Sequence, residues 1–575
     1  MPEQISLDDS SYDLIYEKAR EHLQTQAPWW THREISDPGI TLLEMWSLLT
    51  DMQSFYMDQI QESHYRKYLK LLGIRPDEGE NAAVWIFFDG VTGNCTVPRG
   101  TKLLADRMVF ETEEEVELTS NRITGFYQEA GKNRADAMQM FRKNRFRLQE
   151  GEALFSFSLE KAVAAGGKLT LFVLLDERIN RNPAPEDFYM VRLVWEFWTR
   201  EGWREARVEK DETRGLLYSG CICLWMDQTM EHRERTGFEI RCRIIEGAYD
   251  VMPALYKVCL NVTKAVQKNT LCCQESAEFT KTCHRVQLNG YLAKTGEVRA
   301  FRELGGDLWE DITGKCVIGP PVSAECRNRY AEYPGEGRVK LLCSAWGFLE
   351  EYGPWTIAGT TSQTIALPWE NLMRSSVELM LRQGRDSGIY RIYRRVEPEE
   401  ERYENAWHWQ EEENVIVLGD GRHGDIPLAC ENGLRFTSLV LWEGDGGNAA
   451  IGAIGQWERP DLFPGITCTN FMTAKGGRNR RSPSRQFAEA KAALLLQKRM
   501  ATEEDIRQLV METPGLPLRD AKAEWKEGLL TVTIFPWAAL NSGYCSERYC
   551  TLVERHLEPY RLAGSRIKVR IAEEG

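Results

Sequence analysis

Three glycines in the stretch VIVLGDGRHGDIP have a spacing that could serve nucleotide chemistry. Gly419, Gly421 and Gly424 form G-x-G-x-x-G directly after an apolar run at positions 415–418. In dinucleotide-binding proteins such glycines let the backbone approach a pyrophosphate, and the following helix supplies free N–H groups at its positive end. The spacing therefore raises the question of whether a helix follows.

The residues after these glycines do not favour a helix. Pro427 lies where the second helical turn would form, removing an N–H group and clashing with the preceding carbonyl. Asn432 and Gly433 predict a further turn before the next strand. Glu443 does lie about twenty residues beyond the glycines, where a ribose-binding acid is expected. A strand, a turn and another strand lack the phosphate-binding helix, so we predict a structural turn and no bound cofactor.

Other catalytic and metal-binding patterns are absent from the sequence. It contains no H-E-x-x-H, G-x-S-x-G or G-x-x-x-x-G-K-[ST] motif, and its eight histidines are scattered. The fifteen cysteines form no paired C-x-x-C knuckles, which predicts reduced core thiols and leaves a zinc site as the alternative. Paired-acid glycosidase sites have no fixed spacing, so 86 acidic residues do not exclude one. We predict that the protein is not an enzyme.

Composition and charge narrow the class of protein. A chain of 575 residues suggests about three to five folding units, and 42% hydrophobic residues indicate a globular protein. The net charge of −14 favours a positively charged protein partner over nucleic acid or an anionic membrane. The N-terminus lacks a signal-peptide pattern, and the longest apolar run, 82–88, is too short to cross a bilayer. We expect a soluble protein made in the cytosol, without direct membrane insertion.

A long helical pattern carries the first candidate interface. Asp37 is expected to cap a helix that begins at Pro38 and ends at Gly73, with a break between Glu62 and His64 as an alternative. Apolar side chains recur every three or four residues and form one stripe: Leu42, Met45, Leu49, Met52, Tyr56 and Ile60. Three further side chains widen this stripe beyond what one neighbouring helix would cover: Trp46, Leu48 and Phe55. An intrachain bundle and a helix shared with other subunits both explain the pattern.

After residue 81 the apolar period changes to two. Short alternating segments, separated by Gly, Pro and Asn, predict antiparallel β-rich domains: AAVWIFFDG, CTVPRGTKLLA, RMVFETEEEVEL, KLTLFVLLDE, YMVRLVWEFWT, GLLYSGCICLWM, GFEIRCRII, YKVCLNVTKAVQ, RVQLNGYLA and VELMLRQG. Within the first two β-rich tracts only 135–145 and 162–165 look helical, and VEPEEERYEN at 396–405 is expected to be a solvated loop.

The last section returns to helical patterns at 482–514. Thr502 and Asp505 are expected to form an N-terminal capping pair, and Pro514 with Gly515 should stop the helix. A strand at 528–536, a helix at 546–564 and a strand at 566–572 then follow. This order is typical of a small α+β domain in which the two strands pair in one sheet.

These patterns predict a multi-domain α+β fold with long N-terminal helices, several antiparallel β-rich domains and a small C-terminal α+β domain. The expected boundaries are 1–80 for the helical segment, 81–276 for the first β-rich domain with a middle tract, 277–410 for an inserted β-rich domain, 411–481 for the glycine-turn region and 482–575 for the C-terminal domain.

Two further surface features could contact partners. The segment GGRNRRSPSR carries four arginines in an otherwise acidic protein: Arg478, Arg480, Arg481 and Arg485. A solvated loop or a docking patch for an acidic subunit is favoured over a grip on nucleic-acid or lipid phosphate. The helix AEAKAALLLQKR has more apolar residues than one packing face needs, at Leu494, Leu495 and Leu496, which predicts contacts between copies.

Several of these motifs resemble the baseplate J-like family of contractile phage tails and related injection systems. The family's strand ends in a GDG-x-x-G-x-x-P turn, matched here by Gly419, Asp420, Gly421, Gly424 and Pro427, and a G-x-x-G-N turn follows at Gly444, Gly447 and Asn448. Similar segments occur in order along nearly the whole chain: the N-terminal helix, VPRGTKLLA with FET, VWEFWTREGWREARVEKDETRGLLYSG with GAYDVMPALYKVCLNV, AKGGRNRRS, RMATEEDIRQLVMETPG and HLEPYRLAGSRIKVRI. The sequence departs from the family at Leu418, Ala449 and Phe471, where Phe, Val and Pro are usual, and 277–409 matches least clearly.

The resemblance implies a structural rather than a chemical role. Such proteins resemble baseplate wedge subunits, in which copies associate with one another, with a second wedge protein and with an inner, sheath-initiating baseplate protein. They join a central hub and spike to the sheath and transmit the contraction trigger, so the expected location is a phage-tail-like particle assembled in the cytoplasm. The competing hypothesis is a glycan-binding or glycan-active protein, suggested by the β-rich modules and eighteen tryptophans.

Overall fold

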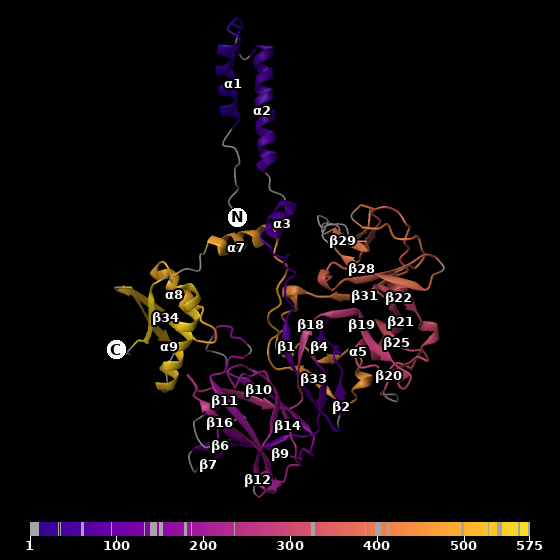
Figure 1. The fold of residues 1–575 in the computed structure, drawn as a ribbon, viewed down its shortest axis with the longest axis vertical. Coiled ribbons are helices and arrows are strands. Elements are labelled where there is room, and N and C mark those ends of the chain that lie inside the picture. The colour runs from indigo at the N-terminus through magenta and orange to yellow at the C-terminus, as the bar shows by residue number, and fades with distance from the viewer. Residues whose placement is uncertain are drawn as a thin grey trace. The chain divides into compact units, whose positions relative to one another are not determined.

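The computed structural model describes most of the chain in two compact units. The described residues are 11–32, 34, 36–58, 62–93, 95–130, 133–138, 146–148, 153–176, 181–185, 187–234, 236–323, 328–385, 387–396, 404–410, 414–422, 424–495, 500–526, 528–537, 543–561 and 564–572. One unit comprises 1–79 with 480–497, and the other comprises 80–479 with 498–575. The predicted multi-domain α+β class, with helices first and antiparallel sheets after them, is confirmed (Figure 1).

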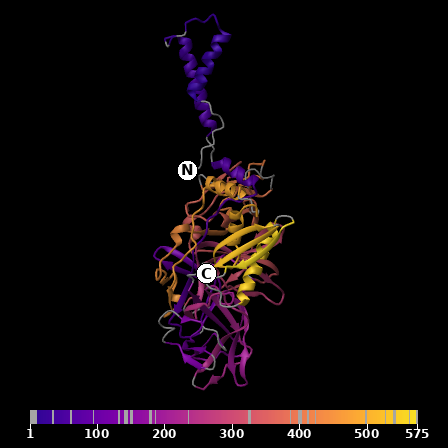
Figure 2. The same ribbon diagram turned by 90° about the vertical axis from the view of Figure 1, so that its left-hand side faces the viewer.

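The first unit is helical. Its helices are α1 (Tyr12–Gln26), α2 (Pro38–Asp58), α3 (Glu62–Leu71) and α7 (Pro483–Leu495). Figures 1 and 2 both show α1 and α2 side by side. Asp37 caps α2 as predicted, because its Oδ1 accepts a 2.7 Å hydrogen bond from the Gly39 N–H. Gly73 ends α3 as predicted, at a φ of 69°.

The long helical pattern contains α2 and α3, and three residues between them are not described. No break lies between Glu62 and His64, because α3 runs unbroken from Glu62. Residues 59–61, which include Ile60 of the predicted stripe, lie outside the described residues.

The second unit contains the predicted antiparallel sheets. The first sheet has the order β32 (Gln456–Trp457), β3 (Lys102–Ala105), β4 (Met108–Thr112), β18 (Val262–Gln267), β1 (Ala83–Asp89) and β33 (Thr467–Asn470), beside the pair β2 (Cys95–Val97) and β5 (Val116–Leu118). Strands from residues 83–112, 262–267 and 456–470 thus share one sheet. Val84, Ile86 and Phe88 alternate inward along β1 into its core.

Two further sheets enclose one large core between them. One has the order β13 (Arg207–Asp211), β14 (Gly220–Trp225), β10 (Lys168–Leu175), β17 (Ala254–Cys259) and β8 (Phe146–Arg147). The other has the order β12 (Gly202–Glu205), β11 (Val191–Thr199), β16 (Gly237–Gly247), β9 (Phe155–Leu159), β6 (Ile123–Ala130) and β7 (Asn133–Asp136), with β15 (His232–Arg233) beside β16. Trp195, Phe155 and Leu171 are among the fully buried side chains that the two sheets share.

A ten-stranded sheet follows in the next part of the chain. Its order is β22 (Leu308–Asp311), β21 (Glu297–Gly305), β25 (Gly337–Ser344), β19 (Asn269–Phe279), β31 (Leu434–Leu441), β27 (Glu378–Arg382), β28 (Ile389–Arg395), β29 (Ala406–Gln410), β30 (Val415–Leu418) and β26 (Thr364–Ala366). Because β22 also pairs with β28, the first seven strands close into a ring. The helices α5 (Tyr291–Thr295) and α6 (Phe348–Tyr352) and a small sheet of β20 (Arg285–Gln287), β24 (Tyr330–Glu332) and β23 (Val317–Ile318) accompany it.

One local prediction is corrected by longer-range contacts, and a second is contradicted only at its first residues. The predicted helix at 162–165 is a loop and turn, because Val163 O accepts from Met230 N and Gly166 N donates to Met226 O. Of the predicted helix at 135–145, the first two residues belong to β7, Met138 is helical, and 139–145 lie outside the described residues. The charged segment at 397–403 also lies outside them.

The described residues after 500 contain the predicted order of helix, strand, helix and strand, with one additional strand. The helices α8 (Glu503–Met511) and α9 (Gly543–Leu557) cover one face of a sheet with the order β34 (Leu518–Lys526), β35 (Leu529–Pro536) and β36 (Arg566–Ile571). The Thr502–Asp505 capping box is confirmed, and β35 and β36 pair in parallel around α9. Sequence patterns missed β34, because its alternate buried positions are alanines between charged residues.

Candidate assembly interface

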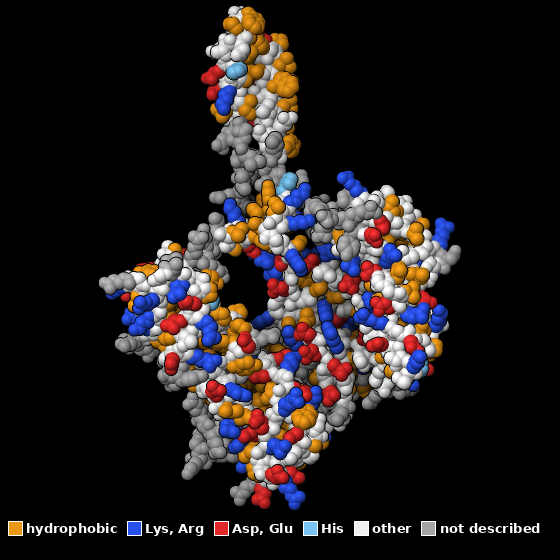
Figure 3. Space-filling model, viewed as in Figure 1, with side chains coloured by type: hydrophobic (Ala, Val, Ile, Leu, Met, Phe, Trp, Pro, Cys, Tyr) orange, Lys and Arg blue, Asp and Glu red, His pale blue; other side chains and the backbone are white. Residues whose placement is uncertain are grey.

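The helix α2 exposes its apolar side. Eight large side chains are each 43% exposed or more: Leu42, Met45, Trp46, Leu48, Leu49, Met52, Phe55 and Tyr56. At about 100° per residue they span about half of the helix circumference. Figure 3 shows hydrophobic side chains gathered along this helix. The predicted stripe is therefore present, and nothing in the described part of the chain covers it.

The covered side of α2 is partly polar. Ile40 and Ser47 are 1% and 2% exposed, and Glu44, Asp51 and Ser54 are half-buried. These positions follow the i, i+4, i+7 spacing of one helix face, and α1 is the helix packed against α2. A helix in a globular protein normally buries its apolar side and exposes its polar side. In α2 the side that packs against α1 is partly polar, and the apolar side is exposed.

A tryptophan fixes the entrance to this helix. The Trp30 indole N–H donates a 2.8 Å hydrogen bond to Asp37 Oδ2, while Asp37 Oδ1 caps the first turn. The pKa of Asp37 is lowered, first by the hydrogen bond from Trp30 and then by that from the Gly39 backbone. One carboxylate thus orients both the preceding loop and the helix.

The helix α7 packs on α3 within the same unit. Its Phe487 ring lies 5.6 Å from the centroids of both Tyr65 and Tyr68, so residues over 400 positions apart form one small aromatic cluster. Of the three predicted interface leucines, Leu494 is 63% exposed. The side chain of Leu495 and all of Leu496 lie outside the description.

The four predicted interface arginines already have acidic partners within the chain. Arg478 pairs with Glu80 at 3.1 Å and Arg480 with Glu78 at 3.9 Å. Arg481 contacts Asp77 at 3.1 Å and also Glu489, which lies 3.2 Å from Arg485. The acidic residues of 77–80 therefore neutralise much of the positive charge that predicted a docking patch at 478–485. A contact with an acidic neighbour stays a prediction, and it would compete with these pairs.

The GDG turn directly follows β30 and leads into backbone without regular secondary structure. Gly421 has a φ of 85° and donates to Gly424 O at 2.7 Å. A Cβ on Gly419 would lie 2.4 Å from Asp425 O, so this close approach requires glycine. Among the described residues from Asp420 to Gly433, including Pro427, none is helical. The helix that a pyrophosphate would need is absent from this described stretch, as the sequence predicts.

The Gly-Asn turn is tied to the basic segment. Gly444–Gly447 forms a single 3-10 turn, and the Asn448 amide exchanges hydrogen bonds with the Gly477 backbone at 2.9 and 3.0 Å. A Cβ on Gly447 would lie 2.9 Å from the Gln267 side chain. These turns hold three distant chain segments together, which is a packing role.

A buried ionic cluster that sequence patterns missed attaches α9 to the larger domain. Arg181 contacts both carboxylate oxygens of Asp250, at 2.7 and 2.6 Å, and the Tyr549 hydroxyl donates to Asp250 at 2.5 Å. The side chains of Arg181 and Asp250 are only 8% and 0% exposed. Burial alone would raise the pKa of Asp250, but the hydrogen bonds and charge of Arg181 hold it below its usual value. The three residues share no motif, so no sequence spacing predicts their contact.

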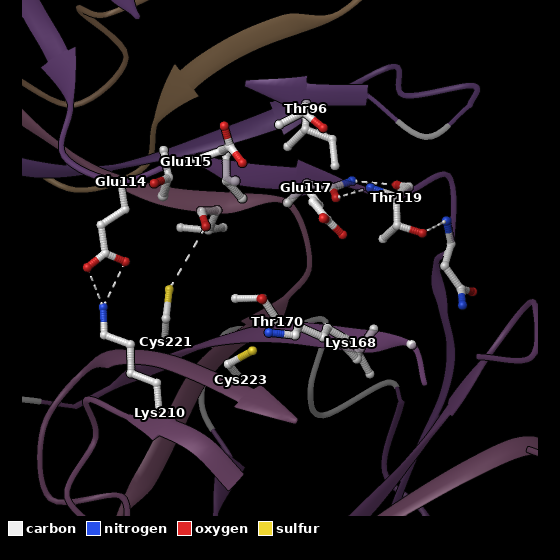
Figure 4. A pocket seen from close by; sticks show the side chains of 18 of the residues that line it. Thr96, Glu114, Glu115, Glu117, Thr119, Lys168, Thr170, Lys210, Cys221 and Cys223 are labelled. Atoms are coloured by element: carbon white, nitrogen blue, oxygen red, sulfur yellow. Dashed lines mark hydrogen bonds and ion pairs between the residues drawn. The ribbon is translucent and has the colours of Figure 1, made fainter. Parts of the chain in front are cut away.

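A cavity of about 970 Å³ has a lining rich in paired charges. Lys210 bridges Glu114 at 2.7 Å (Figure 4) and Glu212 at 2.8 Å. Lys168 contacts Glu209 at 2.6 Å. Burial raises the pKa of the Cys223 thiol in its wall, whereas a nucleophilic cysteine needs a lowered pKa. Lys168 and Lys210 are therefore neutralised by neighbouring carboxylates, and the Cys223 thiol is not activated.

One pair of neighbouring tryptophans offers no open glycan platform, whereas Trp29, Trp346 and Trp537 are each more than half exposed. Trp198 and Trp203 lie 5.3 Å apart on neighbouring strands, but Arg233 covers the Trp198 ring at 4.6 Å and Arg241 covers the Trp203 ring at 4.2 Å. These guanidinium groups occupy the ring faces on which a sugar would stack.

The cysteines fit the prediction of reduced thiols. All the described cysteines are free, and most are buried. The described residues contain no group of three metal-ligating side chains. Among the described helices, none combines the length and apolar character that crossing a bilayer requires.

The N-terminal helices also carry the family match. Residues 11–67 match the family described as bacteriophage baseplate protein, N-terminal domain. This match supports the predicted baseplate class, but it does not reach the GDG and Gly-Asn turns, so the baseplate J-like assignment stays a prediction. No curated protein matches the chain.

Two solved baseplate structures contain similar chains. One belongs to the type VI secretion system TssK-TssF-TssG baseplate subcomplex, with 9% identity, 92% of this chain and 96% of that chain covered, and a TM-score of 0.39. The other belongs to the anti-feeding prophage baseplate, with 8% identity, coverage of 97% and 71%, and a TM-score of 0.30. At such TM-scores the likenesses carry no functional argument.

Proposed function

We propose that this chain is a structural wedge component of the baseplate of a contractile phage tail or a related injection system. In this role it belongs to the baseplate J-like family, links the hub and spike to the sheath, and passes on the contraction trigger through subunit contacts. Its partners are other copies of itself, a second wedge protein and an inner, sheath-initiating protein. The proposal includes no reaction and no cofactor.

The observation that carries this proposal is the exposed apolar side of α2. Fully burying one large apolar side chain contributes about 1.5–3 kcal/mol. The eight exposed side chains are 43–67% accessible, so covering them would contribute on the order of 10 kcal/mol by the same rule. An apolar surface of this kind on a helix marks a contact with another protein. The same helix lies within the segment that matches a baseplate N-terminal domain.

A bundle shared between subunits suits this surface better than a single partner helix. One neighbouring helix covers an apolar stripe of about 100°, whereas the exposed apolar side of α2 spans about half the circumference. Two helices, from other chains, would be needed to cover it. The positions we assign to this contact are Leu42, Met45, Trp46, Leu49, Met52 and Tyr56 of α2, with Leu494, Leu495 and Leu496 and the segment 478–485 as secondary contacts.

The test is a charge placed in the centre of this surface. Leu49→Asp should prevent the chain from assembling with its neighbouring baseplate subunits, because burying the new carboxylate would be strongly unfavourable. Thr50→Asp is the matched control: it adds the same charge one residue later, at an exposed polar position. Co-purification and negative-stain electron microscopy of particles measure assembly, and circular dichroism of the isolated chains checks that both variants stay helical.

Two results would count against the proposal. Normal particles containing Leu49→Asp would rule out the shared bundle. A wild-type chain that stays monomeric beside its neighbouring subunits, together with particles that assemble without it, would rule out the wedge role.

A further inference from the structure

The C-terminal sheet has helices on one face only. Its strands β35 and β36 are parallel, and parallel strands are normally covered on both faces. Here α8 and α9 pack on the face that carries Leu530, Val532, Ile534 and Val569. In Figure 2, which is viewed from the left-hand side of Figure 1, these strands face the viewer. The other face is left open in the described structure.

The open face has a cationic rim around a less polar centre. The strand register places Lys526 beside Leu529 and Arg566 in one row, and Lys522 beside Thr533 and Arg570 in another. Between these rows lies a third one. It contains Glu524, Thr531 and Lys568. The two outer strands thus supply five cations and one acid, while the central strand β35 supplies apolar and hydroxyl groups.

No ion pair joins these cations to an acidic side chain among the described residues, but Lys522 helps the hydrogen bond from Arg507 to lower the pKa of Asp520, which lies two positions earlier on β34. Lys522, Lys526, Lys568, Arg566 and Arg570 are all exposed. Arg570 donates only to the Thr533 hydroxyl, at 2.9 Å, and Lys522 lies 5.7 Å from the centroid of the Phe535 ring. In a chain with a net charge of −14, such a local surplus of positive charge favours an anionic partner.

The dimensions of the face suit an α-helix. The outer strands β34 and β36 lie about 9.5 Å apart, as two strand spacings of about 4.8 Å require, and a helix with its side chains is about 10–12 Å wide. A helix lying along β35 would place an apolar stripe on Leu529, Thr531 and Thr533. Carboxylates on its flanks would then meet the cations of the two outer strands.

The mixed charge of the face favours protein over nucleic acid. A phosphate backbone presents only negative charge, so Glu524 in the middle row would repel it. A protein helix can present a cation to Glu524 and carboxylates elsewhere. The less polar centre with a charged rim is also the usual pattern of a protein interface.

We infer that the open face of the β34–β35–β36 sheet binds an acidic amphipathic helix of a partner protein. The helix replaces the missing second layer of the α+β domain. This inference is independent of the proposed baseplate function, because it uses only the geometry and charge of residues 518–571.

The test uses the full-length chain and synthetic helices. The probe is a fluorescent amphipathic peptide with a leucine stripe flanked by glutamates, and the comparison probes are a scrambled peptide of the same composition, a peptide with lysines in place of the glutamates, and an oligo-uridine RNA. Fluorescence anisotropy measures binding. The wild-type chain should bind the first peptide at least tenfold more tightly than the other probes, and carbodiimide should couple its glutamates to Lys522 or Lys568.

Two variants test the cationic rim and the centre of the open face separately. The triple variant Lys522→Glu, Lys568→Glu and Arg570→Glu should weaken binding about tenfold or more, which is the order expected for several lost exposed ion pairs. Thr531→Asp keeps the cations but places a charge under the apolar stripe, and it should weaken binding too. A matched triple reversal makes the same change in net charge at exposed positions outside this domain: Arg207→Glu, Lys281→Glu and Arg338→Glu.

The outcomes are decisive in both directions. Binding that is lost in the rim and centre variants and retained in the matched triple supports the inference. Equal binding by the wild-type chain and the rim variant would overturn it, as would preferential binding of RNA that the rim variant loses. Hydrogen exchange of α9 confirms that each variant keeps the domain folded.

Discussion

Replacing Asp250 with Asn should release the C-terminal domain from the sheet domain that it contacts. Asp250 accepts hydrogen bonds from Arg181, from the Tyr549 hydroxyl and, at 2.8 Å, from the Val251 N–H. An asparagine would fit the space but would leave the Arg181 guanidinium buried without its counter-ion. Removing one partner of a buried ion pair typically costs about 3–5 kcal/mol.

A second variant provides an internal scale for this effect. Tyr549→Phe removes one hydrogen bond to a charged group, worth about 1.5–3 kcal/mol, and leaves the Arg181–Asp250 pair intact. Thr551→Ala is the control, because Thr551 is exposed on the same helix and bonds only within it. The expected order of destabilisation is Asp250→Asn, then Tyr549→Phe, then Thr551→Ala.

Native-state hydrogen exchange of the full-length chain measures this order locally. A loss of about 3–5 kcal/mol should increase amide exchange in α9 by more than about a hundredfold, because each 1.4 kcal/mol is a factor of ten. Exchange in the distant strand β1 should stay unchanged. If α9 in Asp250→Asn exchanged at the wild-type rate, the buried pair would not hold this domain in place.

The same carboxyl gives the attachment a predictable pH dependence. Arg181 and Tyr549 outweigh the effect of burial and lower the pKa of Asp250. Its stabilising contribution is therefore complete above the ordinary Asp pKa of about 4 and is lost as the pH falls through the lower folded-state pKa. Protection of α9 should fall in this acidic window in the wild-type chain, and Asp250→Asn should remove this part of the dependence.

Three further predictions concern other parts of the chain. Gly444→Ala should destabilise the Gly-Asn turn by about 1–3 kcal/mol, because Gly444 has a φ of 55° and a Cβ would lie 1.9 Å from Asn479 Oδ1; faster exchange at Gly477 measures this, and unchanged exchange would contradict it. Thr502→Ala should cost about 1 kcal/mol in α8 by removing the cap on the Asp505 N–H, again by hydrogen exchange. Adding a chelator should leave the melting temperature unchanged, since the described residues hold no metal-ligand group; a fall would reveal a bound metal.

Local signals in the sequence predicted the features that neighbouring residues determine. Asp37 before Pro38, Gly73 after the helical pattern and the Thr502–Asp505 pair all act through backbone groups within a few positions. The parallel pairing of β35 and β36 was also predictable, because one helix separates two alternating segments.

Long-range contacts explain what the sequence did not predict. The closure of the ten-stranded sheet depends on Trp309 pairing with Tyr390, 81 positions away, and nothing in either strand identifies the other. Asp250, Arg181 and Tyr549 come from three separate segments, so they look like ordinary charged and aromatic residues. The arginines of 478–485 looked available because their acidic partners at 77–80 lie about 400 residues earlier.

The helix α2 shows why periodicity alone left two explanations open. An apolar stripe with a 3.6-residue period forms whether a helix buries that stripe in its own chain or offers it to another. The distinction requires knowing which side the neighbouring helix covers. In this unit α1 packs near Ser47, while Trp46 and Leu49 stay exposed. Because α1 packs against the partly polar side of α2, the exposed apolar side chains do not contribute to the packing between these two helices. An exposed apolar side of this extent is the surface that the assembly proposed above would bury.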